Sequence, residues 1–205
     1  MEPMSSGELG LPSSSPLLTH RLEQALRYAA LGHRGQVRRA GELPYFEHIV
    51  AVAWILDRAG FDEDVVIAGL LHDLVEDTAT TPQDIEARFG RTVVDLVGYC
   101  SEQKKDAEGR ERPWIDRKRD HLACMARAPV EARAVILVDK LHNLISIEID
   151  VREGRPVWSQ FHADRAQVLS YYRQAIEICT AGDPRLAPLA SAAHELLTAL
   201  EAAVE

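Results

Sequence analysis

Residues 70–78 read Leu-Leu-His-Asp-Leu-Val-Glu-Asp-Thr and close an apolar pattern that predicts a helix over residues 62–76. Adjacent side chains on a helix point about 100° apart, so His72 and Asp73 can grip one ion from neighbouring directions. Glu76 and Asp77, three and four residues after Asp73, would share its helical face. Three carboxylates on one face repel each other unless a cation or a proton lies among them, and acids near a helix C-terminus also oppose the helix dipole. The stretch therefore predicts a functional site, and the competing interpretation is a solvated acidic helix end.

A second acid lies in an unfavourable position further along the chain. Asp139 directly follows the very apolar run of residues 134–138. An aspartate within such a stripe is costly unless it is paired or bound to a metal. Lys140 is one candidate partner, although adjacent helix residues face apart, and an arginine elsewhere is another. His142 and Asn143, three and four residues after Asp139, would lie on the same helical face.

His48 follows the sequence Pro-Tyr-Phe-Glu of residues 44–47 and begins an apolar helix. A lone histidine in this position is more often a capping or core residue than a metal ligand. His48 becomes a candidate metal ligand only when it is considered together with His72, Asp73 and Asp139. The same holds for His33, and whether it touches a metal stays open.

Helical periodicity recurs from about residue 18 to the end of the chain, without an alternating strand pattern of useful length or an internal repeat. Thr81, Pro82 and Asp84 form a typical helix start, and Gly90 ends that helix. The segment of residues 92–97 has strand-forming composition and is the weakest of the helix predictions. The pattern predicts an all-α fold. The expected helices begin near residue 18 and then cover residues 48–59, 62–76, 82–90, about 91–100, 113–127, 129–153, 160–181 and 185–204, with a loop at residues 101–112.

Length and composition narrow the class of protein. Residues 18–205 suit one domain with one core, and residues 1–17 are expected to form a disordered tail. No apolar run approaches the roughly 20 residues that a membrane helix needs, and no secretory signal is expected. Three widely spaced cysteines indicate reduced thiols and a cytoplasmic protein.

The charge pattern separates two kinds of partner. A net charge of −9, from 32 acidic and 23 basic residues, argues against binding to nucleic acid polymers. Basic side chains are concentrated in residues 34–39 and 104–119. These windows are either solvated loops or a basic mouth for a phosphorylated small molecule. The acidic motifs favour the second interpretation, and the sequence does not predict an oligomeric state.

Five segments follow one another along the chain: residues 33–41 (His-Arg-Gly-Gln-Val-Arg-Arg-Ala-Gly), 44–48 (Pro-Tyr-Phe-Glu-His), 70–78, 89–90 (Phe-Gly) and 139–143 (Asp-Lys-Leu-His-Asn). In this order they resemble the HD superfamily of metal-dependent phosphohydrolases, and more closely the hydrolase domain of the RelA/SpoT alarmone enzymes. The Leu-His-Asp-x-Val-Glu-Asp-Thr block is quite specific. The resemblance implies an all-α HD-domain helical bundle, with the C-terminal helices of small stand-alone members.

The resemblance also implies roles for individual residues. It implies four metal ligands, namely His48, His72, Asp73 and Asp139. It implies two catalytic acids near the attacked phosphate, Glu76 and Asp77. It implies three substrate contacts, Arg38, Arg39 and Asn143, of which Arg38 would lie against the base.

A centre of two imidazoles and two carboxylates suits Mn²⁺, Fe²⁺ or Zn²⁺, and the resemblance favours Mn²⁺. The implied reaction is hydrolysis of the 3′-pyrophosphate of guanosine tetra- or pentaphosphate, by a chain with no room for a separate synthetase domain. Ile49, Val138 and Lys140 depart from the usual family pattern, and the last two could reshape the pocket. The alternatives are phosphohydrolysis of another nucleotide or dinucleotide cofactor, and a nucleotide-sensing HD domain with weak activity.

Overall fold

The computed structural model describes residues 18–38 and 43–203, and most of these residues lie in helices. Within these two ranges no β-strand forms, and only isolated bridges pair Val37 with Pro44 and Lys105 with Glu111. The predicted all-α fold is confirmed. The expected tail at residues 1–17 lies outside the described residues. The helices are α1 (His20–Gly32), α2 (Phe46–Arg58), α3 (Glu63–Leu71), α4 (Leu74–Asp77), α5 (Pro82–Phe89), α6 (Arg91–Cys100), α7 (Trp114–Met125), α8 (Val130–Arg152), the 3₁₀ helix η1 (Val157–Gln160), α9 (Arg165–Cys179) and α10 (Leu186–Ala202).

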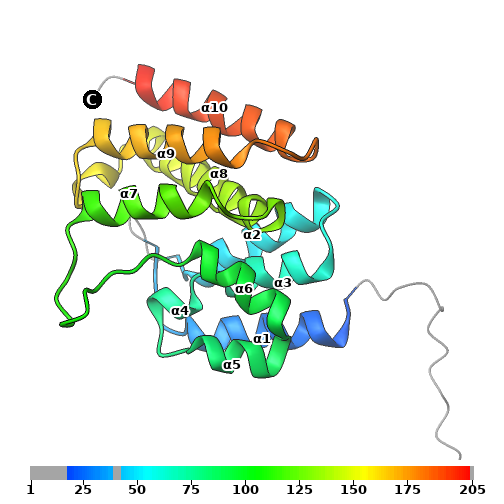
Figure 1. Ribbon diagram of the computed structural model, residues 1–205. Helices are drawn as coiled ribbons and strands as arrows, with labels where there is room; N and C mark the ends of the chain where they lie inside the picture. The colour runs from blue at the N-terminus through cyan, green and yellow to red at the C-terminus, as the bar shows by residue number, and fades with distance from the viewer. Residues whose placement is uncertain (1–17, 39–42, 204–205) are drawn as a thin grey trace, which may run out of the picture.

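Helix α8 is the axis of the molecule. It packs against α2, α3 and α6 on one side and against α9 and α10 on the other (Figure 1). All residues from Ala134 to His142 are buried, including Asp139 and Lys140. Helix α3 is also buried along its length, from Val65 to Leu71. Helix α8 therefore carries Asp139 into the interior, and α3 ends directly before His72, so both side chains lie where desolvation strengthens charge interactions.

The predicted helix over residues 62–76 is wrong as one continuous element. Helix α3 ends at Leu71, and α4 begins at Leu74. Asp73 has φ −99° and ψ −5°, which is typical of a turn. The Nδ1 atom of His72 hydrogen-bonds to the carbonyl oxygen of Gly69 at 2.8 Å, and the hydroxyl of Tyr45 donates to Asp73. These side-chain contacts accompany the departure from the helix that local periodicity predicts, because tertiary contacts override propensity.

Two other helix starts illustrate capping. Thr81 and Asp84 form a reciprocal capping box with Pro82 in the first turn, as predicted. The helix expected to begin at residue 160 begins instead at Arg165, because Asp164 caps the backbone N–H of Gln167 and Gln167 caps in return. Residues 157–160 form η1 rather than part of α9.

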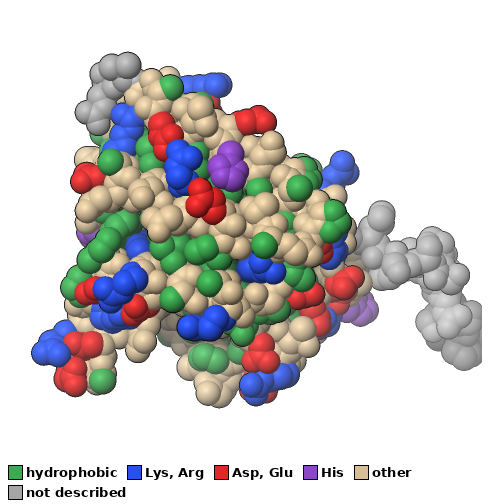
Figure 2. All heavy atoms as spheres, turned by 45° about the horizontal axis from the view of Figure 1, so that its top comes forward, with side chains coloured by type: hydrophobic (Ala, Val, Ile, Leu, Met, Phe, Trp, Pro, Cys, Tyr) green, Lys and Arg blue, Asp and Glu red, His purple; other side chains and the backbone are tan. Residues whose placement is uncertain are grey.

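The surface and the loops carry mixed charge. Basic and acidic side chains are interspersed over the face seen in Figure 2, without one large region of a single sign. The loop between α6 and α7 projects from the bundle (Figure 1). Among the described helices, none is both long enough and apolar enough to cross a membrane.

Candidate metal centre and adjoining pocket

Three helices bring the predicted histidines and aspartates together. His48 comes from the first turns of α2, His72 directly follows α3, and Asp139 lies in the middle of α8. One ligand atom from each of these three residues lies within 4.8 Å of the others. The Nε2 atom of His48 is 3.3 Å from Oδ1 of Asp139, and Nε2 of His72 is 3.9 Å from the same oxygen.

Asp73 lies at the edge of this cluster. Its Oδ2 atom is 3.0 Å from Nε2 of His72 and 3.8 Å from Nε2 of His48. The Tyr45 hydroxyl donates to the same oxygen. Burial and the Asp73 charge raise the pKa of Tyr45 well above its usual value, so the hydroxyl keeps its proton and remains a donor. All four residues predicted from the sequence thus converge.

The donor set fits a divalent cation. The Nε2 atoms of His48 and His72 are buried and have no hydrogen-bond partner, which is costly for polar atoms unless a ligand satisfies them. His72 holds its other nitrogen, Nδ1, on the carbonyl of Gly69, so its Nε2 atom points into the cluster. Although burial opposes the charged form, Asp73 and Asp139 raise the pKa of His72 to about 9, so a cation binds Nε2 in exchange for a proton. Burial lowers the pKa of His48 to about 4, which keeps that ring neutral and able to bind a cation.

Asp139 contacts both the cluster and a buried lysine. Its Oδ2 atom lies 2.5 Å from Nζ of Lys140, and Nδ2 of Asn143 donates to Oδ1 at 2.5 Å. Although burial favours the neutral acid, Lys140 and His48 hold the pKa of Asp139 well below its usual range. Of the two partners considered from the sequence, Lys140 is the one that contacts Asp139, although adjacent helix residues face apart. Its Cβ does point elsewhere, but the flexible four-carbon side chain carries the ammonium back to its neighbour.

The two predicted acids lie beside the cluster, on α4. The backbone N–H of Glu102 donates to Oε2 of Glu76 at 2.9 Å, and Nζ of Lys104 lies 3.1 Å from Oε1 of Glu76. The same ammonium is 2.5 Å from Oδ1 of Asp77. Burial and the nearby Asp73 raise the pKa of Glu76. A basic side chain thus separates acids that were expected to repel each other.

Arg38 and Asn143 form a chain that ends at the cluster. The Arg38 guanidinium donates to Oδ1 of Asn143 at 3.1 Å and lies 5.8 Å from the centre of the Tyr45 ring. Asn143 in turn donates to Asp139. The predicted substrate contact Arg39 lies outside the described residues.

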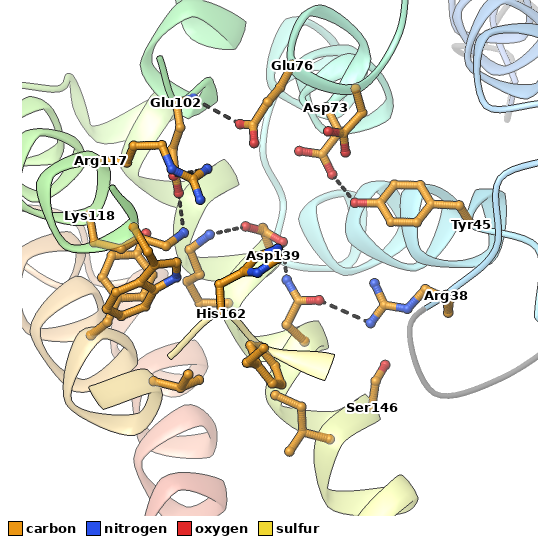
Figure 3. Close-up of a pocket in the computed structure, with 18 of the residues that line it drawn as sticks. Arg38, Tyr45, Asp73, Glu76, Glu102, Arg117, Lys118, Asp139, Ser146 and His162 are labelled. Atoms are coloured by element: carbon orange, nitrogen blue, oxygen red, sulfur yellow. Dashed lines mark hydrogen bonds and ion pairs between the residues drawn. The ribbon is translucent and has the colours of Figure 1, made fainter. Parts of the chain in front are cut away.

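A cavity of about 760 Å³ extends from these residues. Arg38 and Tyr45 form one wall, Glu102 with Arg117 and Lys118 forms the opposite wall, and Asp73 and Glu76 lie between the two (Figure 3). Pockets of roughly 300–1,000 Å³ hold small ligands of nucleotide size. Its lining also includes aromatic side chains from α7, α9 and the segment before α9: Trp114, Phe161, Tyr171 and Tyr172.

Sequence reasoning missed several of these residues. Lys104, Arg117 and Lys118 belong to the basic window of residues 104–119, but only the fold distinguishes them from Arg110, which pairs with Asp106 and Glu108 in the loop. His162, which no sequence motif singles out, also lines the cavity. The concentration of basic residues in this window was visible in the sequence, but it does not predict which of their side chains point into the cavity.

His33 takes a supporting position. Its Nδ1 atom lies 2.7 Å from Oε1 of Gln36, and its ring is 5.1 Å from that of Tyr45. Gln36 also donates to the backbone carbonyl of Asp77 at 2.9 Å. His33 is therefore placed to support the Tyr45 wall, and it is not among the residues whose ligand atoms cluster.

Fold and site together define a helical domain with a histidine–aspartate centre for a divalent cation, and the HD domain family matches residues 25–169. The chain belongs to this family.

Named relatives extend the match. The chain is 36% identical over 145 residues to the guanosine-3′,5′-bis(diphosphate) 3′-pyrophosphohydrolase MESH1 of Drosophila melanogaster, an alignment that spans 69% of this chain and 76% of that protein. It is 39% identical over 127 residues to the bifunctional (p)ppGpp synthase/hydrolase SpoT of Escherichia coli K12, across 60% of this chain but only 18% of that protein. The predicted resemblance is confirmed.

Solved structures agree with the fold. A metazoan ortholog of SpoT, described as hydrolysing ppGpp, superposes with a TM-score of 0.75 at 26% identity, over 90% of this chain and 98% of that one. A protein of Listeria monocytogenes EGD-e superposes with a TM-score of 0.67 at 36% identity, over 80% of this chain and 98% of that one.

Proposed function

We propose that this chain hydrolyses the 3′-pyrophosphate of guanosine tetra- or pentaphosphate, so that ppGpp and water give GDP and pyrophosphate. The observation that carries the proposal is the position of Glu76 and Asp77, between a cluster that fits a divalent cation and a nucleotide-sized cavity with basic walls. The named relatives support the choice of substrate. One domain, residues 18–205, performs the reaction.

His48, His72, Asp73 and Asp139 hold the cation, and Mn²⁺ is the proposed ion. When bound, a divalent cation supplies Lewis acidity and lowers the pKa of a bound water. Asp139 and Asp73 contribute negative charge to this centre, and the two imidazoles contribute neutral nitrogen donors. Lys140 and Tyr45 each contact one of the two carboxylates and restrict its orientation.

The acids on α4 handle the proton. Glu76 has a raised pKa and lies in the cavity, so it is suited to accept a proton near neutral pH and pass it on. Asp77 lies beside it and shares Lys104. A phosphate arriving at this position offers Lys104 a third anionic partner, which frees the two carboxylates for the chemistry.

Basic side chains bind the nucleotide. Arg38 has a planar guanidinium that can stack on a base or grip phosphate oxygens. Asn143 holds Arg38 in place and faces the cavity. Arg39 is the third proposed substrate contact. The substrate is a small nucleotide, and nucleic acid polymers and membranes are not proposed as partners; a cytoplasmic location is proposed for the chain.

One assay tests the assignment against its alternatives. Purified protein is supplied with Mn²⁺ and a panel that contains ppGpp, other nucleotides and dinucleotide cofactors, and the products are identified by chromatography. Pyrophosphate and GDP from ppGpp are the expected products. Orthophosphate from a different member of the panel would instead indicate another HD phosphohydrolase, and no turnover of any member would indicate a sensing domain. The Asp73→Ala variant serves as the control for contaminating activity.

A further inference from the structure

Behind His48, on the side away from the metal cluster, lies a row of two further polar side chains. The Nδ1 atom of His48 is 2.8 Å from Nδ1 of His142. The Nε2 atom of His142 is 3.3 Å from Oε1 of Glu47. Both rings are buried, whereas the Glu47 side chain is 46% exposed. The row therefore runs from the surface, through His142, to the back of a candidate metal ligand.

Hydrogen-bond chemistry restricts where the protons in this row lie. Two ring nitrogens 2.8 Å apart hold one proton between them. The Glu47 carboxylate only accepts, so Nε2 of His142 donates to it and carries the proton of that ring. Nδ1 of His142 is then an acceptor, and Nδ1 of His48 must be the donor. The remaining nitrogen of His48, Nε2, is left with a lone pair.

The opposite arrangement is disfavoured at the Glu47 end and is incompatible with a bound cation. If His142 donated from Nδ1, its Nε2 lone pair would face the Glu47 carboxylate and repel it. His48 would then carry its proton on Nε2, the buried atom that faces the cluster and lies 3.3 Å from Oδ1 of Asp139. A protonated Nε2 cannot bind a cation.

We propose that His142 and Glu47 are positioning residues that hold His48 in the tautomer whose Nε2 lone pair faces the metal centre. The inference rests on the proposed metal centre and assigns the residues that orient one of its ligands. Helix α2 supplies Glu47 and His48, and α8 supplies Asp139 and His142, so the row also ties together the two helices that carry the centre.

The other histidine of the centre is oriented by a different device. Nδ1 of His72 hydrogen-bonds to the backbone carbonyl of Gly69, which can only accept. No side-chain substitution removes that partner. The two histidines can therefore be tested separately, because only the orientation of His48 depends on replaceable side chains.

The main experiment measures Mn²⁺ affinity of purified protein by competition with a fluorescent chelator. His142→Leu removes the acceptor, and we expect about 10- to 100-fold weaker binding, as is typical when an outer hydrogen-bond partner of a metal ligand is lost. His142→Asn presents an amide oxygen close to the original Nδ1 position, and we expect it to restore most of the affinity. Glu47→Leu should weaken binding by a smaller factor, since this carboxylate is half exposed. His194→Leu, on α10 and away from the cavity lining, is the matched control and should bind as the wild type does.

A second measurement observes the tautomer directly. ¹⁵N NMR of the metal-free wild type should show His48 protonated on Nδ1, and the Glu47→Leu variant should show an increased share of the Nε2–H form. Because Glu47 is half exposed, this variant should fold even if His142→Leu does not. His48 protonated mainly on Nε2 in the wild type would overturn the inference.

The measured Mn²⁺ affinities distinguish failure of the positioning role from failure of the proposed metal centre. Wild-type binding of Mn²⁺ together with equal binding by His142→Leu would overturn the positioning role and leave the proposed function standing. Absence of Mn²⁺ binding by the wild type would overturn the proposed metal centre, and the positioning role with it. Weak binding by His142→Leu that His142→Asn restores would support the inference, because loss of packing alone would not be repaired by a smaller polar side chain.

Discussion

Replacing Glu102 with glutamine should destabilise the fold and loosen one wall of the cavity. Only 6% of the Glu102 side chain is exposed, and its carboxylate pairs with Lys118, with Arg117 at 3.6 Å and with Nδ1 of His121 at 3.4 Å. Although burial favours the neutral acid, His121 and Lys118 hold the pKa of Glu102 well below its usual range. Glutamine keeps the shape but removes the charge that these partners face.

The size of the effect follows from burial. Breaking a buried ion pair by removing one partner costs about 3–5 kcal/mol, because the other charge is left uncompensated. Lys118 and Arg117 are 19% and 14% exposed, so water relieves part of that penalty. We expect a loss of about 2–3 kcal/mol in the free energy of unfolding at pH 7. For a chain of this size that is a fall of roughly 4–12 °C in Tm.

The loss in the free energy of unfolding should depend on pH in a specific way. A carboxyl whose pKa is lowered by folding contributes stability above its unfolded value, which is about 4.3 for glutamate, and that contribution is lost as the pH falls toward its folded value. The difference between wild type and Glu102→Gln should therefore be full at pH 7 and shrink progressively below about pH 4.5. Urea unfolding, followed by circular dichroism at a series of pH values, measures the free energy of unfolding of both proteins. Subtracting the value of Glu102→Gln from that of the wild type at each pH cancels the titration of the groups that the two proteins share. Equal unfolding midpoints at pH 7, or a difference that grows on acidification, would refute the reasoning.

Three predictions concern the site itself. Removing one ligand of the centre, in His72→Ala or Asp73→Ala, should abolish turnover and strongly reduce bound metal; full occupancy by elemental analysis would argue against the centre. The double variant Glu76→Gln with Asp77→Asn keeps shape but not proton affinity, so kcat should fall on the order of 10²-fold or more while metal and substrate still bind; a near-normal kcat would exclude both from the chemistry. Arg38→Ala should weaken discrimination between bases, and Arg38→Lys should not fully restore it, because lysine lacks the planar fork; unchanged base preference at low ionic strength would mean that Arg38 only solvates its loop.

Much of the fold was predictable because it is locally encoded. The capping residues Thr81, Pro82 and Asp84 predict the start of α5. The strand-forming composition of residues 92–97 misleads less than expected, because the apolar side chains Val93, Leu96 and Val97 recur at helical spacing and are buried together in α6.

Local rules failed where side chains from distant segments act on the backbone or on each other. The break between α3 and α4 lies at Asp73, whose carboxylate accepts from Tyr45, a residue 28 positions earlier in the chain. Lys140 contacts Asp139 because burial leaves a long side chain no better partner for its charge, which helix geometry alone does not predict.

The sequence by itself determined the helical class, because helical periodicity is visible without a structure. It also named the four candidate ligands, because acids in unfavourable positions drew attention to the segments whose resemblance to a known family implies those ligands. Only the tertiary structure decided which basic residues reach the cavity. Lys104 turns toward Glu76 and Asp77, whereas Arg110 in the same window pairs within its own loop. The physical reason is that charge and spacing are properties of the chain, but the direction of a loop side chain is set by the helices packed around it.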